Sequence, residues 1–207
     1  INSFRVVVVV DVGISVPYIS IVGLPDNAVS EARDRVHSAI KNSGYSCPLG
    51  RVIVNLAPAD IRKEGTNFDL PIAIGILKEQ GIDIKDDLNT GFIGELSLDG
   101  SLRKINGVLP LVSGLKDSGV TTVFVPSENA KEAALVQGVR VYGAKHLGDI
   151  VNLNGNEPRL ARHTPHFADS VDQGVHIAQA RHGIGRIRKT AVDDDAHIHV
   201  GLGVGAV

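Results

Sequence analysis

Residues 65–73 read Gly-Thr-Asn-Phe-Asp-Leu-Pro-Ile-Ala, a stretch that leads from a polar loop (residues 59–67) into an apolar segment. The apolar segment predicts a helix. Asp69 can accept amide protons of a first helical turn, and Pro71 needs no amide donor of its own there. We therefore expect Asp69 to cap this helix at its amino end.

The sequence before this helix alternates apolar strands with one further helix. Apolar residues recur at helical spacing from Ala28 to Ile40, with Asp26 placed as the N-cap and Gly44 as the stop. The expected strands are residues 4–12, 18–22 and 51–56.

The sequence after it contains a hairpin signal, Asp99-Gly100, between apolar runs at residues 92–98 and 102–105. Helices are expected at residues 108–117, 129–137 and 145–152, and strands at residues 120–125 and 139–142. Strands and helices do not alternate one for one. The pattern therefore predicts an α+β or mixed α/β fold rather than a doubly wound sheet.

Composition excludes several classes of protein. Of 207 residues, 43% are hydrophobic and 21% charged, which rules out a wholly disordered chain, and the net charge of −2 gives no global attraction to nucleic acid. The single cysteine, Cys47, excludes a disulfide framework and suits a reducing cytosol, so we expect a cytoplasmic protein. No apolar run approaches the ~20 residues of a membrane span. The sequence contains no methionine, so we expect the native protein to be longer.

The composition changes near residue 155, which divides the chain into a domain at residues 1–155 and a poorly specified tail or linker at residues 156–207. In the tail, residues 183–190 approach a phosphate-binding loop, but Arg188 replaces the glycine that such a loop requires. His197 and His199 lie near three aspartates without further ligands at defined spacing, so no metal site is expected.

Six short motifs occur in a specific order. They are Ile-Val-Gly-Leu-Pro-Asp at 21–26, Asn-Leu-Ala-Pro-Ala-Asp at 55–60, Lys-Glu-Gly at 63–65, Phe-Asp-Leu-Pro-Ile-Ala at 68–73, Gly-Glu-Leu-x-Leu-Asp-Gly at 94–100 and Ile-x-Gly at 105–107. With them, residues 4–153 resemble the N-terminal domain of the ComM/YifB proteins, which are often labelled magnesium-chelatase-like.

The resemblance implies a fold similar to the Lon-protease catalytic domain and to the second domain of ribosomal protein S5. It also implies that the domain precedes an AAA+ ATPase module that uses ATP and Mg²⁺, with no cofactor bound by the fragment itself. Proteins of this family act as hexameric helicases that move DNA branch points in transformation and recombination. DNA and further copies of the chain are therefore the expected partners.

Lon-type proteases use a serine activated by a lysine whose pKa must fall. By the resemblance, the serine position falls at or beside Asn67 and the lysine position near Leu109. Asn67 cannot form an alkoxide, and Leu109 carries no base. We therefore expect no catalytic residue and a non-catalytic accessory module. The alternatives are a Lon-related peptidase with a rearranged site, acylated at Thr66 or a nearby serine, or a magnesium-chelatase-type subunit.

Two groups of charged residues are candidates for contact with DNA phosphates or a neighbouring subunit. They are Arg62, Lys63 and Glu64 in the loop before the helix, and Arg103 and Lys104 after the hairpin. The alternative for the first group is a solvated turn in which Glu and Lys offset each other, and for the second an exposed strand edge. Glu95, between apolar residues, is expected to be a paired, buried carboxylate. Charged residues of the first helix, namely Glu31, Arg33, Asp34, Arg35 and Lys41, are expected to form a solvated face.

Overall fold

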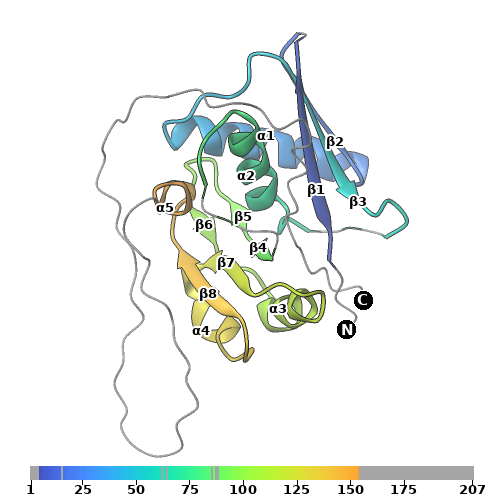
Figure 1. Ribbon diagram of the computed structural model, residues 1–207. Helices are drawn as coiled ribbons and strands as arrows, with labels where there is room; N and C mark the ends of the chain where they lie inside the picture. Colours follow the sequence, from blue (N-terminus) through green and yellow to red (C-terminus); the bar gives the residue numbers. More distant parts are fainter. Residues whose placement is uncertain are drawn as a thin grey trace, which may run out of the picture.

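The computed structural model describes residues 5–14, 16–61, 63, 65–84, 86 and 89–153. Two three-stranded sheets and a two-stranded ladder share one continuous hydrophobic core, with helices packed between and around them (Figure 1). Both strands and helices are present in mixed arrangement, so the α+β prediction is confirmed. None of the helices in this part of the chain is long and apolar enough to cross a bilayer.

The first sheet is built from β1 (Val7–Gly13), β2 (Tyr18–Val22) and β3 (Arg51–Ala57) in the order β1-β3-β2. β3 runs antiparallel to β1 and parallel to β2, so the parallel pair is joined by a helix, α1 (Asp26–Asn42). Alternate strand residues are buried on the side that faces the helices: Val8, Val10, Ile19, Ile21, Val52, Val54 and Leu56. This period of two is the signal that predicts the strands.

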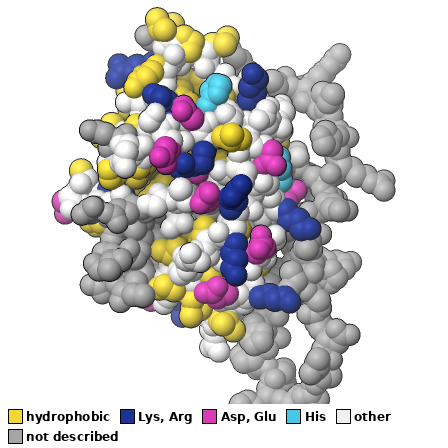
Figure 2. Space-filling view, turned by 180° about the vertical axis from the view of Figure 1, so that it is seen from behind, with side chains coloured by type: hydrophobic (Ala, Val, Ile, Leu, Met, Phe, Trp, Pro, Cys, Tyr) yellow, Lys and Arg dark blue, Asp and Glu magenta, His cyan; other side chains and the backbone are white. Residues whose placement is uncertain are grey.

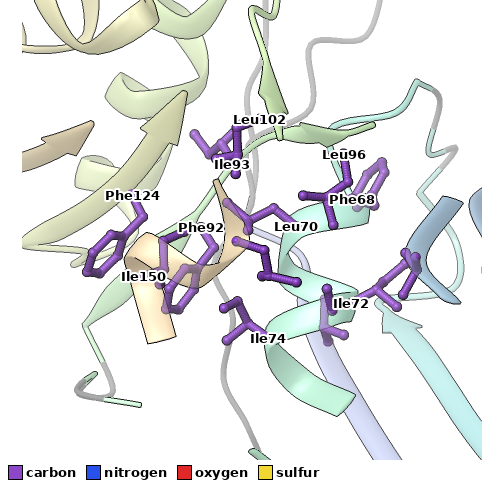
Figure 3. Packing of buried hydrophobic residues seen from close by; sticks show 14 of the residues in the cluster. Phe68, Leu70, Ile72, Ile74, Phe92, Ile93, Leu96, Leu102, Phe124 and Ile150 are labelled. Atoms are coloured by element: carbon purple, nitrogen blue, oxygen red, sulfur yellow. The ribbon is translucent and has the colours of Figure 1, made fainter. Parts of the chain in front are cut away.

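Helix α2 (Asp69–Glu79) occupies the centre of the molecule, and every residue from Asp69 to Leu77 is buried. It lies against β1 at Gly75, where a Cβ atom would come within 2.7 Å of Val10 Cγ2. Figure 3 shows Leu70 and Ile74 of this helix close to side chains of the second half of the domain, including Phe92. The helix therefore joins the two sheets into one core.

The second sheet is parallel throughout and contains β4 (Thr90–Phe92), β7 (Thr122–Pro126) and β8 (Arg140–Ala144) in that order. The connections run through α3 (Val108–Asp117) and through the 3-10 turn η1 (Ser127–Asn129) with α4 (Ala130–Ala133). Stacked aromatic rings cross the three strands in register: Phe92 on Phe124 at 5.0 Å between centroids, and Phe124 on Tyr142 at 5.1 Å.

A short hairpin connects the two halves. Its strands are β5 (Glu95–Leu96) and β6 (Leu102–Arg103), and the tip is the predicted Asp99-Gly100 turn, with Gly100 at φ +88°. The last described helix, α5 (Leu147–Val151), lies beside this tip.

Several predicted details differ from the structure. The apolar run at residues 92–98 is divided between β4 and β5, which belong to different sheets. α1 begins at Asp26, so Pro25 rather than Asp26 occupies the N-cap position. The helix expected at residues 129–137 stops at Ala133, because the amides of Leu135 and Val136 bond to carbonyls three residues back instead of four. The tail predictions, including residues 183–190, His197 and His199, lie outside the described residues.

Candidate functional site

The polar centre of the molecule lies at the amino end of α2, where Asp69 from α2 meets Arg35 from α1. Arg35 Nε donates to Asp69 Oδ2 at 2.7 Å, and Arg35 Nη2 donates to Oδ1 at 3.2 Å. The Asp69 side chain is 1% exposed and that of Arg35 is 21% exposed. Bidentate pairing of this kind fixes both position and orientation, so it ties α1 to α2.

The role of Asp69 corrects the expectation that it caps α2. Phe68 occupies the N-cap position and Asp69 is the first helical residue. Its carboxylate also accepts the amide of Leu96, with 3.4 Å between Leu96 N and Asp69 Oδ2. Asp69 therefore links α1, α2 and β5 instead of closing its own helix.

Burial controls the protonation of this site. Loss of solvent raises the pKa of Asp69 from 3.8 to about 6, while the hydrogen bonds and charge of Arg35 oppose that rise. The same hydrogen bonding raises the pKa of Arg35, so the guanidinium keeps its charge. Glu95 and Glu31 add negative potential around Arg35.

Thr66 and Glu95 extend the network towards the hairpin. The Thr66 hydroxyl donates to Glu95 Oε2, and Glu95 is half-buried. Glu95 stands opposite Arg103 across the β5–β6 ladder. The Glu95 carboxylate is thus held by the Thr66 hydroxyl, and it is half-buried rather than buried as expected.

Asn67 and Leu109, which the resemblance places at the positions of a Lon-type dyad, carry no nucleophile and no base. The carbonyl of Asn67 accepts the amide of Gly94 at 3.2 Å, and Leu109 is a partly exposed residue in the first turn of α3. An amide and an alkyl side chain cannot perform acyl transfer.

Of the first group of contact candidates, the structure describes Lys63, whereas Arg62 and Glu64 lie outside the described residues. Lys63 is 1% exposed, and its ammonium donates to the carbonyls of Pro58 and Ile61, the latter at 3.1 Å. Burial lowers its pKa. The ammonium holds the loop after β3 and is not presented to solvent, where a phosphate would bind.

The second group is exposed. Arg103 Nε donates to Ser97 Oγ at 2.6 Å, and Lys104 follows it on the surface. Figure 2 shows one face of the molecule, on which lysine and arginine alternate with acidic side chains and form no continuous basic area. Among the residues that the structure describes, no three His, Cys, Asp or Glu side chains are grouped to hold a metal ion.

Arg35 is a further site residue whose predicted place is wrong, since its helical position indicates a solvated face. The missed signal is Asp69, an acid inside an otherwise apolar stretch from Phe68 to Leu77. A carboxylate buried there requires a cation or a proton. The sequence does not show which cation supplies the charge.

The raised pKa of Asp69 predicts a pH dependence of stability. Because the folded state binds the Asp69 proton more tightly than the unfolded state does, this group's contribution to stability is lost as pH rises from about 4 to about 6. We compare the wild type with Asp69→Asn, in which this position cannot titrate. The free energy of unfolding of the wild type relative to that of the variant is expected to fall by about 2–3 kcal/mol between pH 4 and pH 7. Urea unfolding followed by circular dichroism measures this difference. A difference that grows with pH would show that pairing with Arg35 outweighs burial.

The fold and site define a class of domain: an α+β domain in which a buried ion pair, Arg35 with Asp69, ties two helices together at the centre of the core. The family model described as subunit ChlI of Mg-chelatase matches residues 8–129, more than half of the chain. The chain is 44% identical over 143 residues to competence protein ComM of Haemophilus influenzae, covering 68% of this chain and 28% of that protein. It is 38% identical over 177 residues to the uncharacterized protein YifB of Escherichia coli, covering 84% of this chain and 34% of that protein.

The chain therefore belongs to the Mg-chelatase-like family that includes the ComM and YifB proteins. It is also 30% identical over 97 residues to Lon protease 2 of Bacillus subtilis, covering 46% of this chain and 17% of that protein. The chain spans about a third of the length of the ComM and YifB relatives.

Proposed function

We propose that this chain is a non-catalytic N-terminal module of a ComM/YifB-type AAA+ ATPase that supports ring assembly and contacts DNA. The observation that supports the proposal most directly is the match to the ComM and YifB proteins over 68–84% of the chain. On that resemblance, Asn67 and Leu109 stand at the positions of the Lon-type dyad, and the buried Arg35–Asp69 pair serves the fold. ATP and Mg²⁺ act in the AAA+ module of the whole protein. The phosphate-binding loop that they require does not occur among residues 5–153.

The hairpin is the part of the module that we assign to DNA. Arg103 and Lys104 are exposed next to each other, and the Arg103 side chain is held by Ser97, which reduces the entropy lost on binding a phosphate. Lys63 does not take part, because its ammonium is satisfied inside the loop. A peptidase with a rearranged site is less well supported, since the Thr66 hydroxyl has a carboxylate partner but no lysine at the dyad position.

Fluorescence anisotropy tests the proposal with single-stranded and four-way-junction DNA across a salt series. We expect salt-dependent binding, and the double variant Arg103→Ala/Lys104→Ala is expected to reduce the slope of log K against log salt by about 0.7–0.9 for each phosphate that the variant no longer binds. Lys131→Ala, which removes an exposed lysine of α4, is the matched control and is expected to leave the slope unchanged.

Two results would contradict the proposal in different ways. Absence of binding at low salt would remove the DNA contact and leave subunit assembly as the role of the module. ATP hydrolysis by the purified chain, assayed alongside, would show that the chain is itself catalytic.

A further inference from the structure

Three segments that are distant in the sequence meet at the tip of the hairpin: the end of α1, the turn at residues 98–101 and the start of α5 (Figure 1). Asn42 Nδ2 donates to the carbonyl of Leu98 at 2.7 Å. The amide of Leu147 donates to the carbonyl of Gly100 at 2.8 Å, and Ser101 forms an isolated bridge with His146. The junction thus connects the hairpin to the last described helix.

His146 is the residue of the junction that uses both of its ring nitrogens. Nδ1 accepts the amide of Gly148 at 3.1 Å and so caps α5. Nε2 lies 2.8 Å from the carbonyl oxygen of Asp99. Since Nδ1 accepts, it carries no proton, and Nε2 must be the donor to Asp99. The geometry therefore defines a neutral imidazole in one tautomer.

The remaining polar groups of the junction already have partners. The Asp149 carboxylate accepts the amides of Lys145 and His146, and Asp99 Oδ1 accepts the amide and hydroxyl of Ser101. From α1, the Ser43 hydroxyl donates to the carbonyl of Ala39. The charged residues in contact with His146 or next to it in the chain are Asp99 on the hairpin, Asp149 on α5 and the exposed Lys145.

A second proton on the ring changes this arrangement at one atom. Protonated Nδ1 is a donor that points at the Gly148 amide, itself a donor, so the half of the cap that the ring supplies is lost. The other half, in which Asp149 accepts the amide of His146, does not involve the ring. The Nε2 contact with Asp99 survives, because Nε2 donates in both forms. The effect of protonation is therefore directed at α5 and leaves the hairpin tip in place.

We propose that His146 is a pH-sensitive latch that holds the amino end of α5 against the hairpin when its ring is neutral and releases that end when Nδ1 is protonated. The helix that responds is the one through which the chain leaves the described domain. Leu147, Ile150 and Val151 bury it in the core, so release frays its first turn without detaching the helix. The latch does not depend on the proposed DNA contact.

Residue-resolved amide exchange on the 207-residue chain tests the latch, with protection factors corrected for intrinsic exchange between pH 5.5 and 8. We expect the protection of the Gly148 amide to fall about fivefold at the acidic end in the wild type. His146→Asn keeps an N-cap acceptor that does not titrate, so its protection is expected to stay constant with pH. His146→Ala is expected to have low protection at every pH.

Equal pH dependence in the wild type and His146→Asn would overturn the proposal, as would full protection of Gly148 in His146→Ala. If a variant does not fold, the nitrogen chemical shifts of the wild-type ring supply the test. An unprotonated Nδ1 at pH 8 that gains its proton in step with the loss of Gly148 protection supports the latch. A protonated Nδ1 at pH 8 excludes it.

Discussion

Replacing Arg35 by methionine is expected to lower the free energy of unfolding by about 3–5 kcal/mol at pH 8, because it leaves the Asp69 carboxylate buried without a counter-ion. Methionine keeps an unbranched stem of similar length, so most of the packing between α1 and the core is retained. The loss is expected to shrink towards pH 5, where Asp69 can take up a proton instead. Urea unfolding followed by circular dichroism suits this chain, which has no tryptophan.

Arg33→Met is the matched control. Arg33 lies on the same helix and pairs with Asp34, whose side chain is 71% exposed. A surface pair of this kind contributes at most about 1 kcal/mol. Adding Asp69→Asn to Arg35→Met is expected to recover part of the loss, because no buried charge then remains. Equal effects of Arg33→Met and Arg35→Met would show that the buried pair does not stabilise the fold.

The second large effect is expected for Gly100→Ala, with a loss of about 2–4 kcal/mol in the free energy of unfolding. A Cβ atom there would lie 2.2 Å from Ser43 Oγ and 2.8 Å from His146 Nε2 and Cε1, so both side chains must move away from their hydrogen-bond partners. Each broken hydrogen bond costs about 1 kcal/mol, and the positive φ adds about 1–2 kcal/mol of strain.

Gly119→Ala separates the two causes. Gly119 has φ +90°, and a Cβ atom at this position would have no neighbouring atom within 4 Å. Alanine at residue 119 is therefore destabilised by backbone strain alone, without a steric clash. The excess loss of Gly100→Ala over Gly119→Ala, measured by the same urea unfolding, reports the crowding at the junction. Similar losses of unfolding free energy for both variants would show that the junction accommodates the Cβ atom at residue 100 without a further loss of stability.

Local patterns are sufficient to predict where most helices and strands lie. The bounds of β2 and α3 follow from apolar periodicity, and the Asp99-Gly100 turn follows from its two residues. These signals depend on neighbours within a few positions in the chain. Helix caps are less predictable, since Asp26 and Asp69 both lie one residue inside their helices.

Contacts between distant segments are not predictable from one sequence. Arg35 and Asp69 are 34 positions apart, and neither residue alone specifies the other. The stacking of Phe92, Phe124 and Tyr142 likewise depends on strand order, which periodicity does not encode. For the candidate site, the absence of a dyad at Asn67 and Leu109 stays a prediction from residue type and resemblance. The burial of Lys63 could not be predicted, because it depends on the path of the loop.

The strand order β1-β3-β2 has a consequence for synthesis on the ribosome. β1 and β2 do not pair with each other; each pairs with β3, the middle strand. Because β3 is the last of the three to be synthesised, neither strand has a partner until it is made. About 35 residues separate the end of β2 from the end of β3, which at roughly 5–20 residues per second is a delay of about 2–7 s. During that interval the valine-rich β1 has neither its partner strand nor α2 to cover it. Until the central strand emerges, the chain exposes the kind of apolar surface and unpaired strand edge that chaperones protect.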